Sequence, residues 1–177
     1  MTRQNWLYWH QAIDVDDLLK NADLRHPEEA TTFGGERPEY RRSKVKWLSD
    51  HADIKQKLWE YVGQAANSFE ILTSQAAEVQ YTEYHASDGG KYDWHHDVDW
   101  NSGDIGDRKL SVVVQLSDPS EYEGGYFEFQ DVENPKEEMR DKGTILVFPS
   151  LLLHRVTPVT SGVRKSLVAW FEGPPWR

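Results

Sequence analysis

The chain has 177 residues, of which 38% are hydrophobic and 28% are charged, and its formal net charge is −10. This length suits one domain with a sizeable buried core. The acidic balance argues against a general nucleic-acid binder, because phosphate contacts need a concentrated basic face. The chain contains no cysteine, which excludes disulfides, thiolate metal sites and a cysteine nucleophile.

The amino terminus has no apolar run of signal-peptide length. No stretch is continuously apolar for the roughly 18 residues that indicate a membrane span. We therefore expect a soluble, cytoplasmic protein with no membrane partner and no stable nucleic-acid partner.

The first forty residues predict a strand, a helix and a long loop. Trp6–Trp9 is short and aromatic, as expected of a strand, and Asp14 or Asp16 can cap the helix that follows. The loop of residues 26–40 contains the breaker pair Gly34-Gly35. A loop of this length is often functional.

The next two segments differ in character. Arg41–Leu48 is basic, and its charges fit either a solvated edge strand or a rim that attracts an acidic substrate or peptide. Residues 51–73 carry apolar side chains at three- and four-residue steps, which predicts a long helix lying across a sheet. Asp50 is the expected N-cap of this helix.

From residue 79 onward, short apolar runs alternate with glycine and proline turns. Lys109–Leu116 is the clearest strand, and its near-continuous apolar character predicts burial on both faces. The other expected strands cover residues 79–84, 92–98, 126–129, 144–148 and 164–171.

This order of elements predicts an α+β, mainly β fold in which short strands form a barrel or jelly roll. The chain has no repeat, low-complexity tract or linker, which favours a single domain over residues 1–177. Within it, residues 1–78 are expected to provide supporting helices and a substrate loop, and residues 79–177 the β core.

A histidine and a carboxylate two residues apart form the first candidate site. In a strand, His95 and Asp97 project from the same face and offer two ligands to a divalent metal, whereas His96 points away. Asp93 and Asp99 would share that face, so a site built from carboxylates also remains open. The pair needs a third ligand from elsewhere in the chain.

His154 can supply the third ligand, because it follows an expected strand and a short turn. Two histidines and one carboxylate with open positions form the facial triad of non-haem Fe(II) oxygenases. Ten residues later, Arg164 and Ser166 share one face of another strand. A guanidinium fork beside a hydroxyl suits a planar carboxylate, although a salt bridge to one of the chain's acids is the simpler explanation of Arg164.

Together these residues resemble the Fe(II)/2-oxoglutarate dioxygenases, and most closely their prolyl 4-hydroxylase-like branch. The resemblance covers residues 79–176 and depends on the order and spacing of several motifs. They are Tyr92-x-Trp94-His95-x-Asp97, the Gly124-Gly125 turn, Phe148-Pro149-Ser150, His154, and Arg164 with Trp170 six residues later.

The resemblance implies a double-stranded β-helix of the jelly-roll or cupin-like type, with N-terminal supporting helices. It implies Fe(2+), 2-oxoglutarate and O2 as cofactors and cosubstrates, with L-ascorbate as an optional reductant. His95, Asp97 and His154 would bind the metal. Arg164, helped by Ser166, would bind the distal carboxylate of 2-oxoglutarate. Tyr84 and Gln115 match further positions that face this cosubstrate.

Many prolyl hydroxylases have a lysine where this chain has Arg164. The substitution keeps the positive charge but weakens the assignment to the animal collagen-modifying type. A peptidyl proline is the expected substrate, in a protein or peptide that the hydroxylase modifies with release of succinate and CO2. Alternatives are an oxygenase of a free amino acid, small metabolite or modified base, and a non-enzymatic cupin-like binding module.

The expected rim of the site comprises residues 30–40, 99–107 and 118–123. Aromatic side chains there could stack on a proline ring, and basic ones could bind a carbonyl or acid, although each is also explained as an ordinary surface residue. Candidate substrate-binding residues are Tyr40, Arg41, Lys44, Trp100, Tyr122 and Trp170.

Overall fold

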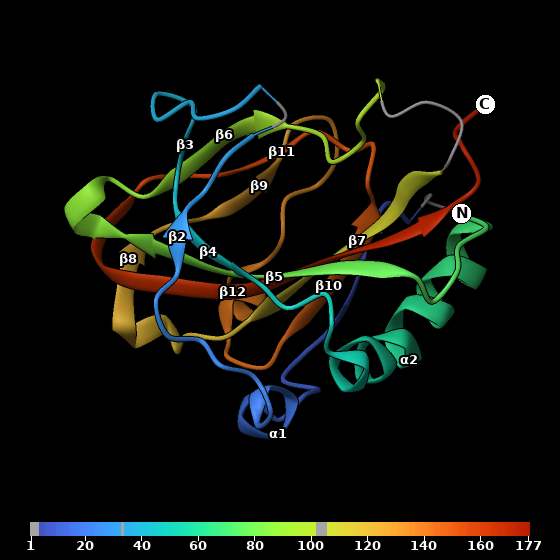
Figure 1. Ribbon diagram of the computed structural model, residues 1–177, viewed down its shortest axis with the longest axis horizontal. Coiled ribbons are helices and arrows are strands. Elements are labelled where there is room, and N and C mark those ends of the chain that lie inside the picture. The colour runs from blue at the N-terminus through green and yellow to red at the C-terminus, as the bar shows by residue number, and fades with distance from the viewer. Residues whose placement is uncertain (1–3, 33, 102–105) are drawn as a thin grey trace.

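The computed structural model describes residues 4–32, 34–101 and 106–177. Two β-sheets face each other, and two helices lie outside the larger sheet (Figure 1). Part of the expected rim segment 99–107 lies outside the described residues. Among the described residues, no helix is both long enough and apolar enough to cross a membrane.

The larger sheet has the strand order β1-β10-β7-β12-β5-β4-β2, and β8 pairs with β12 beside this path. All of the pairs are antiparallel. Its strands are β1 (Leu7–Trp9), β2 (Glu28–Glu29), β4 (Lys44–Trp47), β5 (Ala77–His85), β7 (Asp107–Gln115), β8 (Tyr122–Gly124), β10 (Ile145–Pro149) and β12 (Val159–Gly173).

The smaller sheet has the order β3-β6-β11-β9 and lies over the larger one (Figure 1). Aromatic and apolar side chains, among them Phe129, Leu146 and Phe148, pack between the two sheets. The strands of the smaller sheet are β3 (Arg41–Arg42), β6 (Lys91–His95), β9 (Phe127–Phe129) and β11 (His154–Val156). Short 3-10 turns occupy Ala86–Asp88, Pro119–Glu121 and Glu137–Arg140.

The two helices are α1 (Val15–Leu19) and α2 (Ala52–Phe69). Asp14 caps α1, because its carboxylate accepts hydrogen bonds from two backbone amides of the first turn. The expected cap of α2 was wrong: the helix starts one residue later, so that His51 and not Asp50 is the N-cap. The helix also ends before residue 73, because Glu70 adopts a left-handed conformation with φ 56°.

The main core lies between α2 and the larger sheet. Ile54, Leu58 and Val62 recur on one face of α2 and are fully buried, and α2 packs against β7 and β10. β7 is buried along both faces except at Arg108, as its apolar sequence predicted. A mainly β domain supported by N-terminal helices is therefore confirmed.

Replacing Leu58 with alanine should lower the free energy of unfolding by about 2–5 kcal/mol, because its side chain has 0% exposure and would leave a cavity. Urea denaturation followed by circular dichroism measures the change. Leu72→Ala is the matched control: Leu72 is 75% exposed, so its loss should change stability by less than about 0.5 kcal/mol. Equal effects of the two substitutions would contradict this placement of the core.

The basic segment Arg41–Leu48 is not one edge strand. Arg41–Arg42 pairs with β6 in the smaller sheet, and Lys44–Trp47 pairs with β5 in the larger sheet. Ser43 lies between them, and its carbonyl accepts a hydrogen bond from the amide of Ala30. Of these two strands, β3 lies at the edge of its sheet, whereas β4 is flanked by β5 and β2. The first 78 residues thus add strands to both sheets, in addition to helices.

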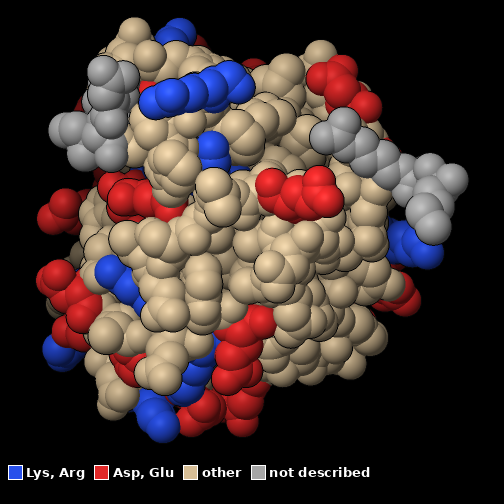
Figure 2. All heavy atoms as spheres, turned by 90° about the vertical axis from the view of Figure 1, so that its right-hand side faces the viewer, with Lys and Arg blue, Asp and Glu red and all other residues tan. Residues whose placement is uncertain are grey.

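Charged side chains of both signs are distributed over the surface. On the face shown in Figure 2, basic side chains are interspersed with acidic ones and form no continuous basic tract. This pattern agrees with the net charge of −10.

Candidate metal centre

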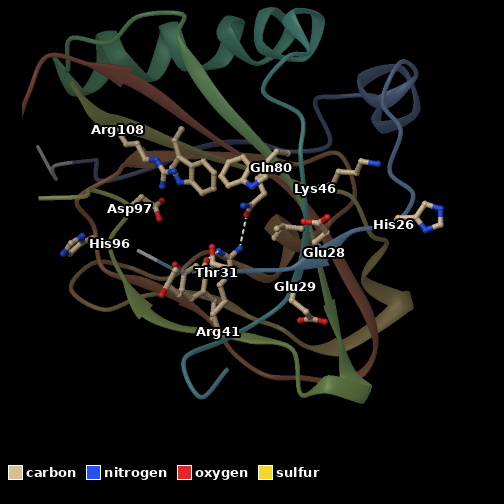
Figure 3. A pocket seen from close by; sticks show the side chains of 15 residues that line it. His26, Glu28, Glu29, Thr31, Arg41, Lys46, Gln80, His96, Asp97 and Arg108 are labelled. Carbon is tan, nitrogen blue, oxygen red and sulfur yellow. Dashed lines mark hydrogen bonds between the residues drawn. The ribbon is translucent and has the colours of Figure 1, made fainter. Parts of the chain in front are cut away.

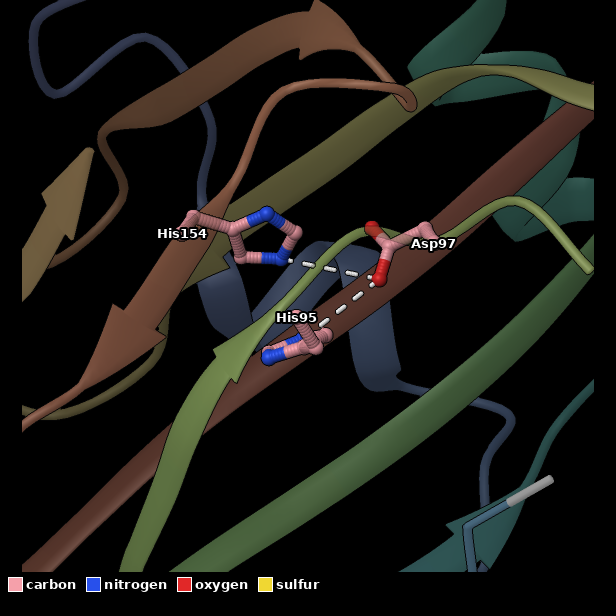
Figure 4. A group of neighbouring side chains, drawn as sticks. All are labelled: His95, Asp97 and His154. Atoms are coloured by element: carbon pink, nitrogen blue, oxygen red, sulfur yellow. Dashed lines mark ion pairs between the residues drawn. The ribbon is translucent and has the colours of Figure 1, made fainter. Parts of the chain in front are cut away.

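Two neighbouring strands and one loop bring the three predicted ligands together. His95 is the last residue of β6, His154 is the first of β11, and the two residues are paired in the smaller sheet. Asp97 lies two residues beyond the end of β6, where its amide donates to the carbonyl of Ser150 at 2.9 Å. Its Oδ1 is 3.5 Å from Nε2 of each histidine (Figure 4). One ligand atom from each residue lies within 4.8 Å of the others.

Both imidazoles are oriented by main-chain carbonyl groups. Nδ1 of His95 is 2.7 Å from the carbonyl oxygen of Asp93, and Nδ1 of His154 is 2.8 Å from that of Leu152. A carbonyl can only accept, so each Nδ1 donates to it and Nε2 is the nitrogen left to bind a metal. Because both Nε2 atoms face Asp97, the lone pairs and the carboxylate converge as metal ligands.

The second oxygen of Asp97 is held by a hydroxyl pair that the sequence analysis missed. Ser111 Oγ on β7 donates to Asp97 Oδ2 at 2.6 Å and is 2.9 Å from Ser150 Oγ. Both serines have 0% exposure. A lone hydroxyl within the apolar run of β7 was the available signal, because a buried polar group requires a partner.

Burial and neighbouring groups together determine the charge of the site. It lowers the pKa of His95 to about 3, with a further contribution from His154, so His95 is neutral at physiological pH. Burial alone would raise the pKa of Asp97, but His154, His95 and the Ser111 hydroxyl outweigh it and hold this pKa below its usual range. Two imidazoles and one carboxylate are the ligand set that suits Fe(II) with open positions.

Replacing Ser111 with alanine should weaken divalent metal binding by about 10–100-fold, because one oxygen of Asp97 loses the group that orients it. Calorimetric titration of the metal-free protein with Mn(II) measures this change without turnover. Ser161→Ala, at an exposed position on β12, is the matched control. Unchanged affinity in a folded Ser111→Ala variant would show that other groups orient Asp97.

Arg164 lies in a cavity with the metal ligands, which we call the inner cavity. Its side chain is 2% exposed, and its guanidinium donates to Gln115 Oε1 at 3.1 Å and lies 5.6 Å from the ring centre of Tyr84. Within the described chain, Arg164 has no ion-pair partner, so the salt-bridge explanation has no support. The inner cavity is lined by Arg41, Gln80, Tyr84, Tyr92, His95, Asp97, Val113, Phe127, Phe148, His154, Val156, Arg164, Ser166, Val168 and Trp170.

The four residues expected at the cosubstrate divide into two groups. Arg164, Ser166 and Tyr84 line the inner cavity. Burial raises the pKa of the Tyr84 phenol, so this side chain is a neutral hydrogen-bond donor. Gln115 instead lines a second cavity, which we call the rear cavity and which Arg164 also lines. The Oε1 atom of Gln115 accepts the hydrogen bond of the Arg164 guanidinium and so helps to fix its position.

Arg41 and Trp170 lie where the inner cavity meets a larger one. Arg41 is 8% exposed and donates to Ser43, to the carbonyl of Thr31 and to Gln80. Trp170 is 6% exposed, and its buried Nε1 has no hydrogen-bond partner among the described residues. Both side chains line both cavities, and their contact with a substrate stays a prediction.

The remaining rim candidates, Tyr40, Trp100 and Tyr122, are not among the residues that line the inner cavity. The Tyr40 hydroxyl donates to the carbonyl of Trp94, and its ring contacts Tyr92 edge-on. Trp100 is 60% exposed and donates to His96 Nε2 at 3.2 Å. Tyr122 is buried in the rear cavity, where the Arg140 guanidinium lies over its ring. Tyr122 is thus directed inward and not toward a substrate.

The sequence of this chain is similar to a known protein family and to several of its members. The model of the 2OG-Fe(II) oxygenase superfamily matches residues 79–172. A PKHD-type hydroxylase of Synechococcus sp. (strain CC9902) is 43% identical over 84 residues, which are 48% of this chain and 37% of that protein. The match therefore spans well under half of that relative. A PKHD-type hydroxylase of Stenotrophomonas maltophilia (strain R551-3) is 29% identical over 92% of this chain and 73% of its own length.

Solved structures agree in fold. A prolyl-4-hydroxylase from Pseudomonas putida superposes with a TM-score of 0.69 at 20% identity, covering 97% of this chain and 94% of its own. The viral collagen prolyl hydroxylase of Paramecium Bursaria Chlorella virus-1 gives 0.66 at 22% identity, covering 96% and 97%. The two facing sheets are the double-stranded β-helix that the sequence predicted. The chain belongs to the 2OG-Fe(II) oxygenase superfamily, whose cofactors are Fe(2+) and 2-oxoglutarate, with O2 as the oxidant.

Proposed function

We propose that this protein is a 2-oxoglutarate-dependent hydroxylase that acts on a peptidyl residue, most simply a proline. One observation carries the proposal: the buried guanidinium of Arg164, which has no acidic partner among the described residues, lines the same cavity as three convergent metal ligands. A binding module of the cupin type has no need for both features. The printed names of the similar proteins, which include prolyl-4-hydroxylases, support proline as the first candidate.

Different residues would have different roles in such a reaction. Iron and 2-oxoglutarate, when bound, would supply the oxidising chemistry: 2-oxoglutarate, O2 and R–H give succinate, CO2 and R–OH. His95, Asp97 and His154 would hold the metal, and Arg164 with Ser166 would orient the distal carboxylate of 2-oxoglutarate. The apolar side chains of the inner cavity, such as Val113 and Phe148, exclude water from it.

The shape of the site favours an extended substrate over a small metabolite. Beyond the inner cavity, an outer cavity of about 470 Å³ and a side cavity of about 340 Å³ share Thr32, Tyr92 and His96 in their linings. Asp97 lines the outer cavity and His95 lines the side cavity. A peptide can therefore cross the metal centre with one flank in each cavity.

The test is a turnover assay with Fe(II), 2-oxoglutarate and a library of proline-containing peptides. We expect succinate to form in step with a gain of one oxygen atom in a peptide, detected by mass spectrometry. A free-amino-acid library provides the alternative substrates. Turnover on a free amino acid with no modified peptide would reject the peptide hydroxylase in favour of a small-molecule oxygenase.

A further inference from the structure

We propose that the substrate carries a positive charge close to the hydroxylated residue, and that Glu28 and Glu29 recognise this charge. The inference deepens the proposed function, on which it rests. It assigns the outer cavity as a specificity subsite for a lysine or arginine side chain of the peptide.

Glu28 and Glu29 form β2, the last strand of the larger sheet, and both line the outer cavity. In Figure 3 they lie on the opposite side of this cavity from Asp97 and Arg108. Asp97 belongs to the metal triad, so the cavity runs from the reacting centre to these two carboxylates. A peptide with its reacting residue at the metal can place a neighbouring side chain beside them.

Arg108 and Lys46, which also line the outer cavity, each have a carboxylate partner. Arg108 Nε donates to Glu78 at 2.9 Å. Lys46 Nζ lies 4.0 Å from Asp23 Oδ1 and donates to the carbonyl of Arg25 at 2.7 Å. Glu28 and Glu29, by contrast, have neither an ion pair nor a side-chain hydrogen bond with any described residue. Two carboxylates without counter-ions, at the mouth of a cavity, attract a cation.

The inner end of the outer cavity has the opposite character. Arg41, which is buried there, is bonded only to neutral groups within the described chain: Ser43, the Thr31 carbonyl and Gln80. The cavity is therefore negative at its mouth and positive near the metal. This polarity suits a ligand with an acceptor group inside and a cation outside, as a peptide carbonyl and a basic side chain provide.

Two tryptophans add contacts that fit the same ligand. Trp47 is 53% exposed and contacts Trp170, their ring centres 5.9 Å apart. An exposed indole that lines the same cavity as two carboxylates favours a cation through its ring face. Trp170 is 94% buried in the cavity wall and keeps an unpartnered Nε1–H. A peptide carbonyl would supply the acceptor that this donor lacks.

The experiment measures peptide binding without turnover. The protein is loaded with 2-oxoglutarate and Mn(II) in place of Fe(II), and labelled nine-residue peptides with a central proline are titrated by fluorescence anisotropy. Each of the three positions on either side of the proline carries lysine, glutamine or glutamate in turn. At one or two positions we expect lysine to bind about tenfold tighter than glutamine at low salt, and glutamate more weakly than glutamine.

Charge variants assign this preference to β2. In E28Q/E29Q the lysine preference should disappear, and in E28K/E29K it should reverse toward glutamate. E60Q/E133Q is the matched control, because it removes the same charge at exposed positions outside the outer cavity. A preference that survives in E28Q/E29Q, or is lost equally in the control, would overturn the assignment.

The outcomes also separate this inference from the proposed function. Peptides that bind and are hydroxylated by the Fe(II) form without any charge preference would overturn only the specificity subsite. Absence of peptide binding, together with succinate formation on a free amino acid, would overturn both. In that case Arg41 and the two glutamates would recognise the carboxylate and ammonium groups of a zwitterion.

Discussion

Replacing His154 with alanine is expected to abolish both iron binding and 2-oxoglutarate turnover. His154 supplies one of three ligand atoms, and its Nε2 lies 3.5 Å from Asp97 Oδ1. Loss of an outer partner of a ligand costs about 10–100-fold in metal affinity, so loss of the ligand itself should cost more than about 100-fold. Calorimetry with Mn(II) and succinate detection with Fe(II) measure the two effects independently.

Two histidine variants make this test specific. His10→Ala removes an exposed imidazole that pairs with Asp141 far from the metal site, and it should retain metal affinity. His96→Ala tests the neighbour of the ligand pair: His96 Nδ1 contacts the carbonyl of Val98, and metal affinity should again be retained. Metal binding that is lost in His96→Ala but kept in His154→Ala would show that the triad was assigned to the wrong histidines.

The sequence was sufficient to predict that these three side chains converge, but the physical basis is different from the expected one. Alternation along a strand placed His95 and Asp97 on one face, whereas β6 ends at His95. Asp97 reaches the site because its amide, in the loop after β6, donates a hydrogen bond to the carbonyl of Ser150, the residue after β10. A contact between segments so far apart in the chain leaves no periodic signal in the sequence. Only the family motif could therefore predict that Asp97 lies beside the two histidines.

The division of one apparent strand between two sheets was also invisible in the sequence. Arg41–Leu48 has a continuous basic and apolar pattern, yet Ser43 separates a strand of the smaller sheet from a strand of the larger one. This division directs Arg41 into the centre of the molecule, where it lines both the inner and the outer cavity. Local propensity describes each residue's conformation but not the sheet that it joins.

Gln115 shows how a correct face can still give a different neighbour. It lies on the same face of β7 as Ser111 and Val113, whose side chains face the metal site. At the end of the strand, however, the partner of Gln115 is the Arg164 guanidinium, and its cavity is the rear one. Strand periodicity predicts the side of a sheet, whereas depth along the strand depends on the register between strands.

Replacing Arg164 with methionine should weaken 2-oxoglutarate binding by more than about 100-fold while the metal site stays formed. The guanidinium is buried and has no acidic partner within the described chain, so a bound carboxylate would be its counter-ion. Removing one member of such a buried pair costs about 3–5 kcal/mol. Methionine approximates the volume of the arginine stem and limits the collapse of the surrounding core.

The decisive comparison uses two cosubstrates that differ only at the distal end. In the wild-type protein loaded with Mn(II), 2-oxoglutarate should bind far more tightly than 2-oxobutanoate, which has no distal carboxylate. In Arg164→Met the two affinities should become similar, because the group that distinguishes them is gone, while Mn(II) affinity changes by less than about threefold. A preference for 2-oxoglutarate that persists in this variant would place the distal carboxylate elsewhere, and Arg41, the other buried guanidinium of the inner cavity, would become its partner.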